Sequence, residues 1–253
     1  MGKIATENQQ VLSHKGLHLY HGDISNCSMR VRMALEEKGL PWVSHHLDLK
    51  KNETRTPAYF AVNPMGLVPA LVHDGVLIIE SDDILEYIDK TFAQPALQPA
   101  DQIGRDEVHA WLKLATSIHI KAVKTTIYTN KMRGVFKHSG VDADEYAKLQ
   151  KDPELLAFHR ISGSADGFTP AQVDTALKIL DECWSRAETA LSQHRWLVGD
   201  GFSLADITWV PLHFTLIGAN YSFEPYPHVR AWAEAVRDRP SFQQGVLKWC
   251  AKF

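Results

Sequence analysis

The chain has 253 residues, 45% of them hydrophobic and 23% charged, and a formal net charge of −3. This near-neutral balance argues against a nucleic-acid-binding protein, and the lack of any run of about 18 apolar residues argues against a membrane protein. The three cysteines, Cys27, Cys183 and Cys250, have neither the spacing of a disulfide framework nor that of a zinc site. We therefore expect a protein of the reducing cytoplasm.

The first third of the chain alternates between strand and helix patterns. Residues 1–16 are polar and of mixed charge, and we expect them to form a frayed N-terminal extension. Residues 17–93 follow the order βαβ, α, ββ, α, and His73, Asp74 and Gly75 between two aliphatic runs are typical of a hairpin. We expect strands at residues 17–20, 42–49, 67–72 and 76–79, and helices at residues 28–38, 56–62 and 81–92. This order predicts a small mixed sheet with one parallel pair and an antiparallel hairpin.

The rest of the chain has only helical patterns. Residues 94–102 contain two prolines and predict a linker. Residues 103–253 then predict an all-helical domain, which opens with one long helix over residues 103–128. Residues 129–169 are polar, and we expect an insertion there with one or two short helices between loops. Regular structure resumes at Thr169, a good N-cap that is followed by proline.

The turn between the first predicted strand and helix gathers hydroxyl, amide and thiol groups. The hydroxyl of Ser25 and the free backbone N–H groups of the first helical turn can converge on one anion. Ser25 or Asn26 is also a good helix cap, so a purely structural role stays open. Cys27 is either a reactive sulfur or a small buried side chain, and Asn26 and Ser28 are candidate auxiliary donors. The turn is thus a candidate catalytic site.

Four motifs resemble those of the cytosolic glutathione transferases, and the resemblance spans residues 17–250. Residues 19–20 and 25–32 resemble the family's active-site turn, residues 63–71 the stretch around its cis-proline, residues 80–81 its acidic-Ser pair, and residues 203–206 its helix-capping signature. Their order and spacing across two domains make the resemblance specific. It implies an α/β plus all-α fold, in which a thioredoxin-like N-terminal domain precedes an all-helical C-terminal domain. It also implies glutathione as cosubstrate and a homodimer.

The resemblance assigns roles to particular residues. Ser25 would stabilise the glutathione thiolate, and Val68, before the cis-proline Pro69, would pair its backbone with the cysteinyl part of glutathione. Glu80 would hold the γ-glutamyl ammonium group, and Ser81 the γ-glutamyl carboxylate. Glu80 and Ser81 could instead be a simple capping pair.

Further polar residues have other expected roles. Arg55, Lys50 or Lys51 would supply a cation for the glycyl carboxylate, unless they are solvated loop charges. Ser203 and Asp206 form a predicted capping box, without a catalytic role. The adjacent His45 and His46 would point to opposite faces of a strand, so we expect no metal site. 

The expected activity is attack of the glutathione thiolate on a small aromatic electrophile. Residues 129–169 and 166–168 resemble the bacterial β-etherase transferases, which suggests cleavage of lignin-derived β-aryl ethers. Residues 224–227 resemble the zeta class, whose alternative activity is glutathione-dependent cis/trans isomerisation. A third alternative is a binding protein that keeps the fold without turnover.

Overall fold

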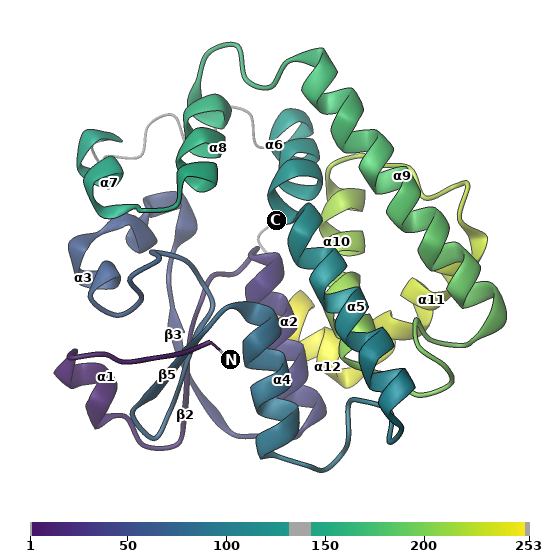
Figure 1. Cartoon of the computed structure of the whole chain (residues 1–253), viewed down its shortest axis with the longest axis horizontal. Coiled ribbons are helices and arrows are strands. Elements are labelled where there is room, and N and C mark those ends of the chain that lie inside the picture. The colour runs from purple at the N-terminus through teal and green to yellow at the C-terminus, as the bar shows by residue number, and fades with distance from the viewer. Residues whose placement is uncertain (1, 132–142, 251–253) are drawn as a thin grey trace.

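The computed structural model describes residues 2–131 and 143–250 (Figure 1). Residues 132–142, part of the predicted insertion, and residues 251–253 lie outside this description. The strands are β1 (Lys3–Ile4), β2 (Leu17–His21), β3 (Trp42–His46), β4 (Ala70–His73) and β5 (Val76–Ile79). The N-terminal helices are α1 (Gln9–Ser13), α2 (Asn26–Glu37), α3 (Pro57–Phe60) and α4 (Ser81–Thr91), with the short turns η1 (Leu49–Lys51) and η2 (Glu53–Arg55).

The remaining elements are helical. They are α5 (Gln102–Ile118), η3 (His119–Lys124), α6 (Thr125–Asn130), α7 (Ala143–Leu149), α8 (Pro153–Gly163), α9 (Pro170–Gln193), α10 (Leu204–Gly218), α11 (Pro227–Arg237), α12 (Pro240–Phe242), η4 (Gln243–Leu247) and α13 (Lys248–Cys250). The predicted fold class is therefore confirmed. No helix within the described residues is both long and apolar enough to cross a membrane.

The sheet has the strand order β1-β5-β4-β2-β3. β2 and β3 are parallel, while the other neighbouring pairs are antiparallel, so the predicted mixed sheet with a hairpin is confirmed. Side chains alternate between the two faces along β2. Leu17 and Leu19 join the core that includes α2 and α4, and Tyr20 belongs to a smaller apolar cluster with Val11 of α1.

The prediction of a frayed N-terminus is wrong. β1 pairs with β5, with Lys3 opposite Ile78, and the Asn8 side chain accepts hydrogen bonds from the first turn of α1. Val11 is fully buried. Polar composition suggested fraying, but the open edge of β5 offers backbone partners that no local pattern reveals.

The predicted single helix over residues 103–128 is interrupted. η3 is a π-helical segment between α5 and α6, and it starts at His119. Such segments often mark functional sites, because one extra residue in the turn re-aims the side chains that follow. The interruption brings His119 and Lys124 to the pocket described below.

Local capping signals in the helical domain are confirmed. Thr169 and Gln172 form a capping box at the start of α9. Ser203 and Asp206 form another at α10, where the buried Asp206 carboxylate also accepts a hydrogen bond from Trp232. Ser203 and Asp206 therefore have the structural role that the sequence predicted.

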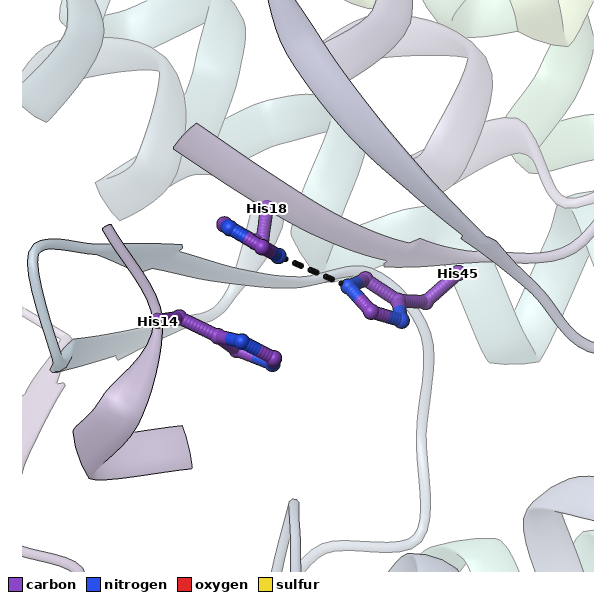
Figure 2. A group of neighbouring side chains, drawn as sticks. All are labelled: His14, His18 and His45. Carbon is purple, nitrogen blue, oxygen red and sulfur yellow. Dashed lines mark hydrogen bonds between the residues drawn. The ribbon is translucent and has the colours of Figure 1, made fainter. Parts of the chain in front are cut away.

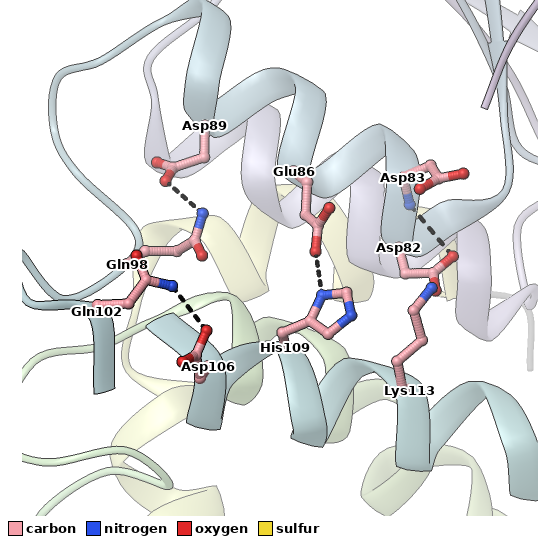
Figure 3. Close-up of polar contacts among 9 residues, drawn as sticks. All are labelled: Asp82, Asp83, Glu86, Asp89, Gln98, Gln102, Asp106, His109 and Lys113. Carbon is pink, nitrogen blue, oxygen red and sulfur yellow. Dashed lines mark hydrogen bonds and ion pairs between the residues drawn. The ribbon is translucent and has the colours of Figure 1, made fainter. Parts of the chain in front are cut away.

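The two domains meet along α2, α4 and α5. Figure 3 shows polar contacts between α4 and α5: a carboxylate oxygen of Asp82 lies 2.8 Å from the Lys113 amine, and a carboxylate oxygen of Glu86 lies 2.7 Å from Nδ1 of His109. On α2, the buried Arg32 donates to the carbonyl of Gly245 at 2.6 Å. A Cβ atom on Gly245 would lie 2.8 Å from the Met33 nitrogen, so this close crossing requires glycine.

Candidate active site

A pocket of about 380 Å³ lies between the two domains. The N-terminal domain lines it with residues of the turn before α2 and of the loop before α4, and the C-terminal domain with residues of η3, α6, α7 and α8. Eight residues predicted from the sequence are among those that line it: Ser25, Asn26, Cys27, Lys50, Arg55, Val68, Glu80 and Ser81. The structure thus brings Ser25 to the same pocket as Ser81, which lies 56 positions later in the chain.

Ser25 is the N-cap of α2. Its oxygen accepts a hydrogen bond from the backbone nitrogen of Ser28 at 3.2 Å, so the structural role that the sequence left open is real. That bond uses only an oxygen lone pair, and the hydroxyl hydrogen stays available to a ligand. Asn26 is buried, and its Oδ1 has no hydrogen-bond partner within the described structure. Ser28 does not line the pocket: it is fully buried and accepts a hydrogen bond from the nitrogen of Gly22.

Cys27 is a free thiol at the boundary of the two domains. Its Sγ lies 3.9 Å from Nε2 of His119, which belongs to η3. Burial lowers the pKa of His119 well below its usual value, so this imidazole is neutral at pH 7. A neutral imidazole cannot form an ion pair with the Cys27 thiolate.

Glu80 and Ser81 lie at the start of α4 and face the same pocket. Glu80 has a φ of 66°, uncommon for a residue with a side chain, and its carboxylate makes no capping hydrogen bond. Glu80 therefore does not cap α4 with its side chain, and the alternative of a simple capping pair is wrong. Desolvation raises the pKa of Glu80, and the nearby Cys27 and Asp82 raise it further. Ser81 is buried and accepts a hydrogen bond from Arg30 at 3.3 Å.

Val68 and Pro69 are joined by a cis peptide bond, as the resemblance implied. Val68 lines the pocket, whereas Pro69 does not.

The loop cations divide into two groups. Arg55 and Lys50 line the pocket, and the Arg55 guanidinium lies 4.9 Å from the centre of the Tyr146 ring. Lys51 does not line it: its side chain is 74% exposed and lies 3.5 Å from Asp48. Lys51 is thus a solvated loop charge, the alternative that the sequence left open.

Three cations that line the pocket, Arg30, Lys124 and Lys131, were not predicted from the sequence. Arg30 is 1% exposed and lies one helical turn after Asn26, a spacing that could have identified it. It donates to the carbonyl of Thr208 at 3.0 Å, and its Nη2 has no partner among the described residues. Lys124 comes from η3, and its amine lies 5.5 Å from the Phe158 ring centre. No local pattern predicted that π-helical segment.

α7 and α8, which lie next to α3 in Figure 1, line one side of the pocket. We call them the aromatic roof, because they contribute the rings of Tyr146 and His159 to the lining. The Tyr146 hydroxyl lies 3.0 Å from Nδ1 of His159, and both side chains line the pocket. Gln150 is buried and donates to the carbonyl of Met65 at 2.8 Å, so the roof is fastened to the loop before Val68. 

A second hollow, of about 460 Å³, lies elsewhere on the surface. It is formed by the linker, the start of α5 and the loop before α10, and Ser203 is among its lining residues. None of the predicted site residues lines it, so the interdomain pocket is the candidate active site.

Two family models match the chain. The N-terminal domain model of glutathione S-transferases matches residues 24–91, and the C-terminal domain model matches residues 150–240. These matches confirm the resemblance drawn from the four motifs.

Individual relatives match over most of their length. Protein LigF of Sphingobium sp. strain SYK-6 is 29% identical over 239 residues, or 90% of this chain and 92% of that protein. The crystal structure of β-etherase LigF superposes with a TM-score of 0.81 at 27% identity, over 94% of this chain and 99% of that one. Glutathione S-transferase Z2 of Arabidopsis thaliana is 28% identical over 91% of this chain and 90% of its own length. A bacterial zeta-class maleyl pyruvate isomerase superposes with a TM-score of 0.66 at 26% identity, over 90% of this chain and 96% of that one.

Proposed function

The chain belongs to the glutathione S-transferase family, and from that premise we propose that the interdomain pocket binds glutathione and presents its thiolate to an aromatic electrophile. Ser25 donates a hydrogen bond to the sulfur, and the backbone of Val68 pairs with the cysteinyl part. Glu80 holds the γ-glutamyl ammonium group, and Ser81 its carboxylate. Arg55 holds the glycyl carboxylate.

These groups can supply the free energy that is needed to lower the pKa of the bound thiol. A free thiol has a pKa of about 8.5, and lowering it by two units requires about 2.7 kcal/mol of preferential binding to the anion. A charge-assisted hydrogen bond from Ser25 contributes about 1.5–3 kcal/mol, and the N-terminus of α2 adds about 0.3–1 kcal/mol. The buried guanidinium of Arg30 strengthens the positive field on the same side of the pocket. 

A matched pair of variants tests the glutathione site. Arg55→Ala should weaken glutathione binding by about tenfold or more, because a carboxylate then loses its charged partner. Lys51→Ala should leave the affinity unchanged, because this side chain is exposed and does not line the pocket. Calorimetric titration with glutathione measures both, and equal affinities for the two variants would contradict the assignment of Arg55.

The electrophile we propose is a β-aryl ether next to a ketone. The thiolate attacks the carbon that bears the aryloxy group; a carbon–sulfur bond forms, the carbon–oxygen bond breaks, and the phenoxide leaves with the bonding pair. The carbonyl activates that carbon, and no oxidant or reductant is needed. The observation that carries this substrate class is the aromatic lining of the pocket: Tyr146 and His159 of the roof and Tyr128 of α6 line the same pocket as Cys27. The similarity to LigF over nearly the whole chain supports the same class.

Product analysis on a β-aryloxy ketone tests the proposed reaction. With glutathione present, the protein should release one phenol for each glutathione thioether formed, and without glutathione it should release none. Absence of phenol release by protein that conjugates a generic aryl halide would contradict the etherase activity while leaving the transferase activity intact. Absence of both reactions, with glutathione still bound, would favour the binding protein without turnover.

A second candidate activity is zeta-like isomerisation of a dicarboxylic acid. In this proposal Arg55 holds glutathione, and four further cations, Arg30, Lys50, Lys124 and Lys131, also line the pocket. The two carboxylates of a dicarboxylic electrophile would suit these cations. The similarity to a zeta-class maleyl pyruvate isomerase supports it. Efficient isomerisation of a maleyl-type diacid, without phenol release from the ether, would select this alternative.

We also propose that the protein is a homodimer and acts in the cytoplasm. Cys27, Cys183 and Cys250 are all free thiols in the structure, which suits a reducing compartment. Light scattering on the purified protein should give twice the chain mass of 28.5 kDa, and a monomer mass would contradict the dimer.

A further inference from the structure

Three histidines from separate segments meet on the face of the sheet that α1 covers. His14 follows α1, His18 lies in β2 and His45 lies in β3, and Figure 2 shows their rings side by side. One nitrogen from each ring can be chosen so that all three atoms lie within 4.8 Å of one another. We propose that His14, His18 and His45 bind one divalent transition-metal ion, with Zn²⁺ as the matching ion.

From the sequence we expected no metal site, because the adjacent His45 and His46 would point to opposite faces of a strand. Their side chains do lie apart: His45 stacks on Tyr20 at 4.3 Å between ring centres, whereas His46 packs against Trp249 at 6.1 Å. The partners of His45 come instead from β2 and from the end of α1. Parallel pairing of Tyr20 with His45 aligns the side chains of β2 and β3 on this face.

Two of the proposed ligands already have nearly the required separation. Nδ1 of His18 lies 2.9 Å from Nε2 of His45. In a tetrahedral zinc site with Zn–N distances of about 2.0–2.1 Å, two ligand nitrogens are separated by about 3.3 Å. His14 has further to move, because its ring is stacked on that of His18 at 3.9 Å with an interplanar angle of 11°. Binding therefore requires a small separation of His18 and His45 and a rotation of the His14 ring.

Hydrogen bonds outside the cluster orient two of the rings. Nε2 of His18 lies 3.0 Å from the carbonyl oxygen of Lys15, so Nε2 carries the proton and Nδ1 keeps its lone pair toward the cluster. The proton between His18 and His45 then belongs to Nε2 of His45, and zinc binding moves it through solvent to Nδ1 of the same ring. Nε2 of His14 lies 2.9 Å from the Tyr20 hydroxyl. Such second partners, which fix the tautomer and the orientation of a ring, are typical of histidine metal ligands.

The ligand set decides the kind of ion. Imidazole nitrogens suit Zn²⁺, Cu²⁺ and Ni²⁺, whereas Ca²⁺ and Mg²⁺ prefer oxygen ligands, which this group lacks. The three histidines do not line the interdomain pocket, so the ion has a structural role. It ties the end of α1 to β2 and β3, and its binding is independent of glutathione.

Zinc titration of the untagged, metal-free full chain tests the site. Calorimetry should give one Zn²⁺ per chain, with affinity at least tenfold lower in each of His14→Gln, His18→Gln and His45→Gln. His46→Gln is the matched control, because this side chain lies next in sequence but on the other face of β3. Wild-type affinity in any of the first three variants, or no zinc binding by the unmodified chain, would overturn the proposal.

A second measurement needs no variant and so does not depend on how the variants fold. Zinc should slow amide hydrogen exchange in α1 (Gln9–Ser13) of the unmodified chain, because His14 directly follows that helix. Unchanged exchange in α1 at saturating zinc would place any bound ion elsewhere and would overturn the proposal.

Discussion

The Sγ atom of Cys27 lies 3.9 Å from Nε2 of His119, so a thiol of the N-terminal domain contacts an imidazole of the C-terminal domain. The nearby hydroxyl of Ser25 belongs to the same turn and lines the same pocket. The pocket thus contains two groups that could act beside the glutathione sulfur, one as a hydrogen-bond donor and one as a thiol. Comparison of two variants separates their roles.

Ser25→Ala should raise the pKa of the bound glutathione thiol by one unit or more while changing glutathione affinity by less than about threefold. One unit corresponds to about 1.4 kcal/mol, which is within the range of one hydrogen bond to an anion. The charged ends of glutathione are held by other residues, so the affinity is preserved. Ultraviolet titration of thiolate absorbance measures the shift. If Cys27→Ala produced the shift and Ser25→Ala did not, the role would belong to Cys27.

Glutathione affinity should fall in acid as Glu80 becomes protonated. Desolvation raises the pKa of Glu80 above its usual value, so the carboxylate is lost at a higher pH than for an exposed glutamate. The charge pair with the γ-glutamyl ammonium group is present above that pKa and is lost as the pH falls through it. Glu80→Gln should bind glutathione more weakly at pH 7 and show a flatter pH dependence. Calorimetry over the acidic range checks both effects, and parallel pH profiles for the two proteins would contradict the role of Glu80.

Gln150→Leu should weaken aromatic substrate binding more than glutathione binding. The substitution removes the hydrogen bond between Gln150 and the carbonyl of Met65, which fastens the aromatic roof to the N-terminal domain. Loss of a buried hydrogen bond costs about 1–3 kcal/mol, so KM for the aromatic substrate should rise by about tenfold. Gln193→Leu is the control, because Gln193 is exposed at the end of α9. Equal KM values for the two variants would show that the roof does not determine substrate binding.

Acid sensitivity of the fold should decrease in His213→Phe. His213 is buried among aromatic rings, its Nε2 has no partner within the described structure, and burial lowers its pKa to about 4. The folded state keeps this ring neutral, whereas the unfolded chain binds a proton there below the usual pKa of about 6.5. The neutral ring therefore costs the fold no stability above pH 6.5, and the free energy of unfolding falls as the pH drops from there toward 4. At pH 5 this effect lowers the free energy of unfolding by about 2 kcal/mol relative to neutral pH. Urea unfolding at pH 7.5 and pH 5 measures it, and an equal loss of stability in both proteins would contradict the prediction.

Elements set by neighbouring residues could be predicted from the sequence. The hairpin at Asp74 and Gly75, and the capping boxes that start at Thr169 and Ser203, depend on groups a few positions apart. The turn at Ser25 belongs to the same class, because its chemistry follows from a strand end and a helix start.

Features that depend on distant segments could not be predicted. β1 needs the open edge of β5, and the π-helical turn η3 that aims Lys124 depends on packing rather than on a local pattern. Lys50 and Lys51 are chemically identical neighbours, and only the fold decides that Lys50 lines the pocket while Lys51 faces solvent.

The short strand β1 has a protective consequence for the whole sheet. Its pairing with β5 fills the hydrogen-bonding edge of a strand whose Val76 is 42% exposed. Without β1, this edge would become a row of unpaired N–H and C=O groups beside apolar surface, which is a template for strand addition between molecules. Lys3 and Ile4 of β1 thus cover an edge at which two molecules could otherwise pair and aggregate.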